Sequence, residues 1–101
     1  MPTTYVINEI SKKLRPIFKP LPIYKVVLFG SYSKGMETKN SDVDIVIDSR
    51  GEIRGLNFYS LLDEIVETLN IDVDLFDASE IQKDSSIYNE IVKNGVTLYE
   101  R

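Results

Sequence analysis

Two pairs of aspartates lie inside apolar stretches of the sequence, and their spacing suggests chemistry that depends on carboxylates. Asp42 and Asp44 are two positions apart in SDVDIVID, and Asp72 and Asp74 have the same spacing in IDVDLFD. Residues two apart on a strand face the same side of a sheet, so each pair should project together, about 7 Å apart. Carboxylates are costly to bury unless they are paired or bind a cation. The pairs are therefore candidate metal ligands.

The two pairs would form one acidic cluster if their strands were neighbours in a sheet. Cross-strand side chains lie about 5 Å apart, so an acid of the second pair would stand beside the first. Crowded carboxylates repel one another, and a divalent cation relieves the repulsion. Two cations about 4 Å apart, bridged by such acids, form the two-metal arrangement for phosphoryl-type displacement. The simpler interpretation, that a D-x-D pair only faces water, stays open; the recurrence of the pair favours the metal site.

The composition limits what other chemistry the chain can perform. Its 101 residues are 43% hydrophobic and 28% charged, which predicts one globular domain over residues 1–101. There is no His and no Cys, so any metal must be held by oxygen, as Mg²⁺, Mn²⁺ and Ca²⁺ are. The net charge of −4 argues against nucleic acid as a partner. We expect a cytoplasmic protein without a membrane span, because no run approaches about 20 apolar residues.

Hydrophobic periodicity predicts the elements that would position these residues. A helix is expected from about Thr4 until Pro16 ends or kinks it. The order of elements favours an α/β or α+β fold, in which helices cover a small mixed β-sheet. The other predicted helices span residues 57–69 and 85–93, the second stopped by Asn94 and Gly95, and the predicted strands span residues 23–29, 41–48, 71–76 and 96–99.

A glycine turn precedes the first aspartate pair. Gly30 follows the strand at 23–29, and Ser31 is positioned to start a short helix, so the N–H groups and the hydroxyl there would suit a phosphate. Two familiar motifs do not fit. A P-loop would need Lys after Gly35, and a calcium loop that starts at Asp42 would place Val46 at its third ligand position.

What remains is Gly-Ser, a gap of ten residues, and then D-x-D, which resembles a known signature. The stretches LFGSYSKG and SDVDIVID are similar to the motif of nucleotidyltransferases of the DNA polymerase β superfamily. The resemblance is closest to the minimal nucleotidyltransferase (MNT) group. The stretch VDLFD resembles the third acidic strand of that group, and the stretch IVKNGVTLYE is similar to the group's ending. It covers residues 5–100 and implies the polymerase β-like nucleotidyltransferase fold.

The resemblance implies an activity and a metal site. Members of the family transfer a nucleoside monophosphate from a nucleoside triphosphate to a hydroxyl, which suggests AMP from ATP here, with Mg²⁺ or Mn²⁺ as cofactor. Asp42, Asp44 and Asp74 would be the catalytic residues and the metal ligands. Asp72 is the alternative third acid. Catalysis in this family depends on positioning the substrates and neutralising phosphate charge, which a site with oxygen ligands and no imidazole can provide.

The resemblance also assigns the nucleotide phosphates to the glycine turn, through Gly30, Ser31 and Lys34. The common form of the turn is G-S-x-A-R-G, whereas this chain has Ser33 and Lys34 at the fourth and fifth positions. Lysine meets a phosphate as a point charge without the bidentate fork of arginine. A solvated surface position for Lys34 stays open as an alternative.

A partner protein is implied as well. Single-domain members that resemble this chain are typically encoded beside a small helical HEPN protein, many act as antitoxins, and some attach AMP to a tyrosine of the partner. Two other functions stay open: an antitoxin that neutralises its partner by contact alone, and transfer to a small molecule or an RNA end. The sequence leaves the acceptor, the nucleotide and the homo- or hetero-oligomeric state undetermined. Apolar residues considered for the partner surface, with core as the alternative, are Ile23, Tyr24, Phe58, Tyr59 and Tyr88.

Overall fold

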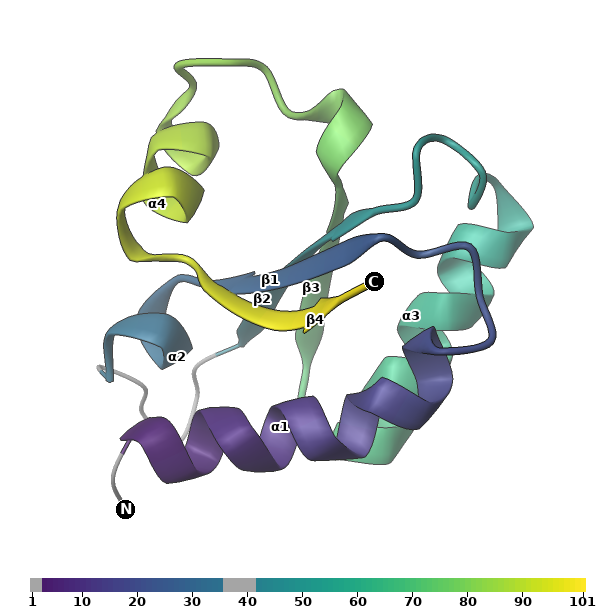
Figure 1. The fold of residues 1–101 in the computed structure, drawn as a ribbon, viewed down its shortest axis with the longest axis horizontal. Coiled ribbons are helices and arrows are strands. Elements are labelled where there is room, and N and C mark those ends of the chain that lie inside the picture. Colours follow the sequence, from purple (N-terminus) through teal and green to yellow (C-terminus); the bar gives the residue numbers. More distant parts are fainter. Residues whose placement is uncertain (1–2, 36–41) are drawn as a thin grey trace.

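The protein forms a mixed four-stranded sheet with helices on both faces, as predicted. The computed structural model describes residues 3–35 and 42–101. Figure 1 shows α1 and α3 on one side of the sheet and α4 on the other. The elements of the described part are α1 (Thr3–Phe18), β1 (Lys25–Phe29), α2 (Ser31–Lys34), β2 (Val43–Asp48), α3 (Leu56–Leu69), β3 (Val73–Asp77), the 3₁₀ turn η1 (Ala78–Glu80), α4 (Ser86–Asn94) and β4 (Val96–Glu100).

The strand order places the two aspartate-bearing strands side by side. The sheet runs β3-β2-β1-β4. β1 pairs antiparallel with β2 and β4, whereas β2 and β3 are parallel. A parallel pair needs a long crossover connection, and α3 supplies it between β2 and β3. The acidic segments 42–44 and 72–74 therefore start at the same end of the sheet.

One face of the sheet is packed against α1 and α3 and forms the core. Alternate residues of β1 and β2 point into it, as strand geometry requires. From α1, Leu14 is fully buried, and from α3, Ile65 is fully buried. The fully buried strand residues of this face are Val26, Leu28, Val43, Ile45 and Ile47.

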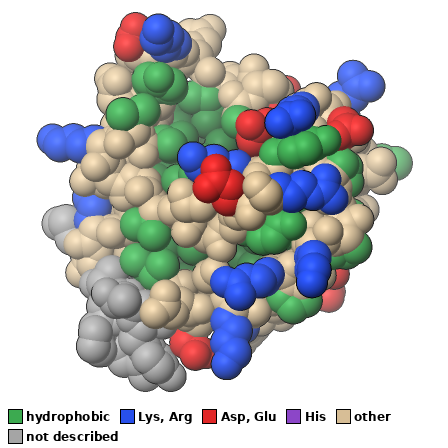
Figure 2. All heavy atoms as spheres, viewed as in Figure 1, with side chains coloured by type: hydrophobic (Ala, Val, Ile, Leu, Met, Phe, Trp, Pro, Cys, Tyr) green, Lys and Arg blue, Asp and Glu red, His purple; other side chains and the backbone are tan. Residues whose placement is uncertain are grey.

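The opposite face of the sheet is only partly covered. α4 crosses it near β1, and a hollow of about 260 Å³ remains between α4 and the sheet. Val27, Val46 and Tyr88 are among the residues that line the hollow, and Figure 2 shows hydrophobic side chains gathered there. Asp44 belongs to this face, because it alternates with the core residues of β2.

Of the two effects predicted for Pro16, ending the first helix is wrong. α1 continues to Phe18, with Pro16 inside its last turn. The Lys19 N–H still donates to the Arg15 carbonyl at 3.0 Å, so helical hydrogen bonding continues past the proline. Phe18 is 1% exposed, and its ring centroid lies 5.8 Å from that of Tyr99. Tertiary packing of this last turn outweighs the loss of one backbone donor.

The predicted strands and the later helices are found with boundaries shifted by one or two residues. The first strand begins at Lys25 rather than at residue 23, because the turn from Leu21 extends further. The predicted start at Ser41 lies outside the described residues. α4 ends at Asn94, one residue later than predicted, and Gly95 has an ordinary φ of −66°. Glycine is needed there for space, since a Cβ would overlap the Ile91 carbonyl oxygen and lie 2.7 Å from Val27 Cγ1.

The residues considered for a partner surface differ in exposure. Ile23 is fully buried, so of its two interpretations the core is correct and the partner surface is not. Tyr24 is partly covered by the Arg50 guanidinium, 3.9 Å from its ring centroid. Phe58 and Tyr88 are half-buried, whereas Tyr59 is 62% exposed. No helix within the described ranges is both long and apolar enough to cross a membrane.

The core predicts a contrast between two leucines. Leu14→Ala should lower the free energy of unfolding by about 2–5 kcal/mol, because it opens a cavity under the sheet. Leu56→Ala is the control, since Leu56 is 85% exposed and its truncation should change stability by less than about 0.5 kcal/mol. Urea unfolding followed by circular dichroism measures both. Equal losses would contradict the assigned core.

Candidate active site

Asp44 and Asp74 meet across the parallel pair of strands. The register of β2 and β3 places them opposite each other. The pKa of Asp44 is raised to about 6, first by partial burial, then by the charge of Asp74 and a hydrogen bond with it, and last by the charge of Asp42. Two carboxylates this close repel each other when both are ionised. The expected cross-strand contact between acids is therefore present.

The other two acids of the pairs lie at the margin of this contact. Asp42 precedes β2 and is exposed, but it is near enough to raise the pKa of Asp44. Asp72 precedes β3 and is exposed, and its carbonyl accepts a hydrogen bond from the Val43 N–H at 3.0 Å. The register thus puts Asp74, not Asp72, beside Asp44. Within residues 3–35 and 42–101, no three acidic side chains are arranged as a ready-made metal site.

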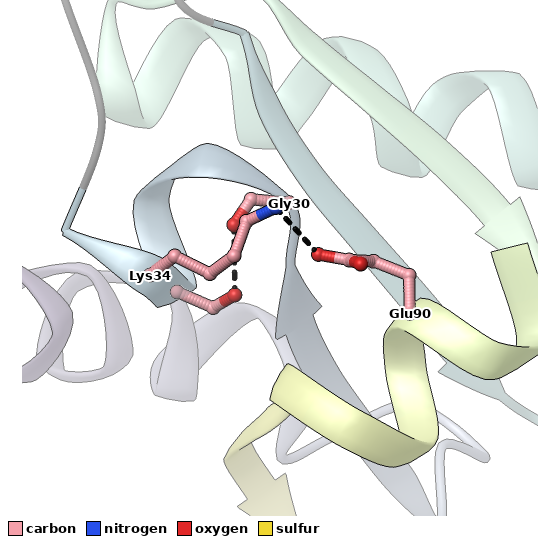
Figure 3. A network of polar contacts seen from close by, with 4 residues as sticks. Gly30, Lys34 and Glu90 are labelled. Atoms are coloured by element: carbon pink, nitrogen blue, oxygen red, sulfur yellow. Dashed lines mark hydrogen bonds and ion pairs between the residues drawn. The ribbon is translucent and has the colours of Figure 1, made fainter.

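The glycine turn is packed directly against Asp44. Gly30 has φ 78° and ψ −153°, a conformation that only glycine adopts readily. A Cβ on Gly30 would overlap Asp44 Oδ2. The Ser33 hydroxyl donates to the Gly30 carbonyl at 2.8 Å and fixes the turn, as Figure 3 shows. Ser31 begins the one-turn helix α2. Of the first acid pair, Asp44 is the residue that the turn contacts.

Lys34 is held by an ion pair that sequence reasoning missed. Its Nζ lies 3.0 Å from Glu90 Oε1, so α2 is linked to α4 beside the turn (Figure 3). The hydrogen bond from Lys34 holds the pKa of Glu90 below its usual value. No local pattern distinguishes Glu90 from the other charged residues of its helix. Only the packing of α4 across the sheet identifies it as a neighbour of the site.

Asp74 also borders a groove. The groove has a volume of about 620 Å³ and follows β3, with walls from α3 and from the segment that joins η1 to α4. Phe58 and Tyr59, which the sequence suggested only as possible partner contacts, are part of its α3 wall. The groove offers space for a large group next to the acidic pair.

The site thus combines a carboxylate pair on neighbouring strands with a glycine turn that abuts it. The model of the family "Polymerase beta, Nucleotidyltransferase" matches residues 12–101. The chain therefore belongs to this family, which confirms the resemblance seen in the sequence and its classification as a nucleotidyltransferase.

Individual relatives narrow the comparison. The chain is 36% identical over 92 residues to the protein adenylyltransferase MntA of Shewanella oneidensis; the match covers 91% of this chain but only 63% of MntA. It is similar, with a TM-score of 0.74 and 28% identity, to a crystal structure of a toxin–antitoxin with AMP-PNP, over 94% of this chain and 73% of that one. It also shares its fold with a chain in a structure of a tri-AMPylated Shewanella oneidensis HEPN toxin in complex with an MNT antitoxin. That match has a TM-score of 0.67 and 24% identity, and it covers 99% of this chain and 74% of the other.

Substitution of Gly30 should disturb Asp44 as well as the backbone. Gly30→Ala should cost about 1–3 kcal/mol of stability because of its φ and ψ, and should also push the Asp44 carboxylate aside. Gly55→Ala is the matched control, since Gly55 has φ 60° and ψ −132° but no atom within 4 Å of an added Cβ. Carboxyl ¹³C shifts followed against pH should show an altered Asp44 titration only in Gly30→Ala. An unchanged titration in that variant would contradict the contact.

Crowding of the acids predicts a pH-dependent effect of Asp44→Asn in the metal-free protein. The raised pKa means that the folded state binds this proton more tightly than the unfolded state, in which the pKa of an Asp is near its ordinary value of 3.8. The ionised carboxylate therefore lowers stability above about pH 6, and this cost disappears as the pH falls toward 4. Asp44→Asn should raise the melting temperature at pH 7.5, and its advantage should shrink at pH 4.5.

The control for this experiment is Asp63→Asn, an exposed acid on α3. The quantity to compare is the difference in melting temperature from the parent protein at each pH, in EDTA. A stabilisation by Asp44→Asn that is the same at both pH values would be inconsistent with relief of charge repulsion.

Proposed function

We propose that this protein is a Mg²⁺-dependent nucleotidyltransferase that transfers AMP from ATP to a hydroxyl group of a HEPN-type partner protein and so acts as an antitoxin. The observation that carries the proposal is the contact of Asp44 with Asp74, closed on one side by Gly30. The similarity to the adenylyltransferase MntA and to a toxin–antitoxin structure with AMP-PNP supports the choice of reaction, nucleotide and partner. A reaction that consumes ATP also favours the cytoplasm as its location.

The acidic residues suit a hard divalent cation. Asp42, Asp44 and Asp74 offer only carboxylate oxygens, the ligands that Mg²⁺ and Mn²⁺ prefer. The mutual repulsion that raises the pKa of Asp44 is what a bound cation would relieve. When bound, the cation would neutralise charge on the phosphates and orient them.

The chain's own residues would divide the remaining work between phosphate binding and proton removal. Gly30 and Ser31 would present backbone N–H groups and a hydroxyl to the β- and γ-phosphates, and Lys34 would add a positive charge. The acceptor oxygen forms a bond with the α-phosphorus, and the bond from that phosphorus to the bridging oxygen of the β-phosphate breaks. Pyrophosphate leaves with the electron pair. Asp74, which is exposed, would take the proton of the acceptor hydroxyl.

A second function, neutralisation of the partner by contact alone, is favoured by two observations. The described acids do not form a complete metal site, and Lys34 is engaged by Glu90 rather than facing the turn unpaired. In that case the fold would serve as a binding module and the acids would be dispensable. The two functions differ in whether the partner becomes covalently labelled.

Calorimetric titration with ATP tests the site. We expect the protein to bind ATP only with Mg²⁺, and the double variant Asp42→Asn/Asp44→Asn to lose this binding while it remains folded, because the cation loses two of its three ligands. The control Asp63→Asn/Glu67→Gln removes two exposed acids of α3 and should bind as the parent does. Binding that survives the Asp42→Asn/Asp44→Asn change, or that needs no Mg²⁺, would contradict the proposed site.

Transfer itself separates the two functions. The protein is incubated with ATP labelled at the α-phosphate, Mg²⁺ and a HEPN-type partner protein. Label on the partner, absent with Asp42→Asn/Asp44→Asn, would support the enzyme. Inhibition of the partner by that double variant, without any label, would support contact neutralisation instead.

A further inference from the structure

The outer edge of β3 is open along the groove that borders Asp74. β3 is the last strand of the sheet, and no strand in the described part of the chain pairs with its outer side. The Asp72 carbonyl is bonded to β2. Because backbone groups alternate in direction along a strand, those of Val73 and Leu75 point to the outer edge. Such an edge can accept another extended chain as an added strand.

The walls of the groove combine apolar surface with negative charge. Every charged residue that lines it is acidic, namely Asp74, Asp77 and Glu80. Asp77 is engaged locally, since it accepts hydrogen bonds from the N–H and hydroxyl of Ser79. The apolar lining comes from α3 on one side and from the η1–α4 segment on the other: Phe58, Tyr59, Leu62, Ile81 and Ile87.

The negative charge of the groove indicates which substrate of a nucleotidyl transfer, the triphosphate or the acceptor, could bind there. A triphosphate is strongly anionic, and an acidic groove without Lys or Arg in its lining repels it. The glycine turn lies on the other side of Asp44, across β1 and β2 from the groove. The groove is thus left for the acceptor, and its lining includes Asp74, the carboxylate proposed to receive the acceptor's proton.

We propose that the groove beside β3 binds an extended, basic segment of the protein that carries the acceptor hydroxyl, as a strand added to the outer edge of β3. This inference rests on the proposed function, because it uses the same Asp74. Apolar side chains of the segment pack on Phe58 and Tyr59, its basic side chains face Glu80, and its hydroxyl reaches Asp74. Protein acceptors with an acidic segment are disfavoured by the same charges.

Fluorescence anisotropy with two labelled hexapeptides tests the groove in the absence of nucleotide. The probes are Arg-Lys-Val-Tyr-Val-Lys and its acidic counterpart Glu-Asp-Val-Tyr-Val-Glu, at low ionic strength. The intact protein should bind the basic peptide at least about tenfold more tightly than the acidic one. Glu80→Lys should reverse or abolish this preference, and Tyr59→Ser should weaken both peptides. The controls are Glu67→Lys, which makes the same charge change, and Leu56→Ser, which also replaces an apolar side chain by serine. Both residues are exposed on α3 and lie outside the lining of the groove.

The outcomes separate this inference from the proposed function. A preference for the basic peptide that responds to Glu80→Lys and Tyr59→Ser, but not to the controls, supports the groove. Equal binding of the two peptides, no binding of either, or equal effects of the groove and control variants overturns it. Calorimetry of the same Glu80→Lys protein with ATP and Mg²⁺ reports on the nucleotide site independently, because Glu80 is not part of it. Normal nucleotide binding with a failed peptide test would therefore reject the groove alone.

Discussion

The repulsion between Asp44 and Asp74 is the constraint on which the rest of the site depends. Two carboxylates are held together by the register of a parallel strand pair, and the fully buried residues that flank Asp44 in β2 keep that register from slipping. Core packing therefore supports an arrangement that is unfavourable in the absence of a cation. Perturbed carboxylates of this kind are frequent at functional sites, so the repulsion between Asp44 and Asp74 supports a bound cation as the ligand of the pair.

The mixed sheet explains how so short a chain can carry such a site. Its two antiparallel pairings join β1 to β2 and β1 to β4. Its one parallel pairing brings the second acidic strand beside the first at the same end. The crossover helix α3 then serves twice, because it covers the core with one face and forms a wall of the β3 groove with residues such as Phe58.

Much of this arrangement could be predicted from the sequence, and the failures have physical causes. Alternation of Asp44 with buried Val and Ile predicts its face, and the Gly30-Ser31 motif predicts the neighbouring turn. Proline rules misjudged the end of α1, because burial of Phe18 outweighs a lost hydrogen bond. The groove and the Lys34–Glu90 pair depend on how distant segments pack, and local pattern carries no information about that. The roles assigned to the site residues remain predictions until the titrations are made.

The ion pair between Lys34 and Glu90 has a thermodynamic consequence. Any anion that engages Lys34 competes with Glu90, so anion binding at the turn and the attachment of α4 to α2 are linked. By reciprocity, whatever draws α4 away from the sheet raises the affinity of the turn for the anion by the same factor by which the anion loosens α4. α4 also covers the hollow on this face of the sheet. A molecule that entered the hollow and displaced α4 would thus change the affinity of the glycine turn for an anion, through the Lys34–Glu90 ion pair.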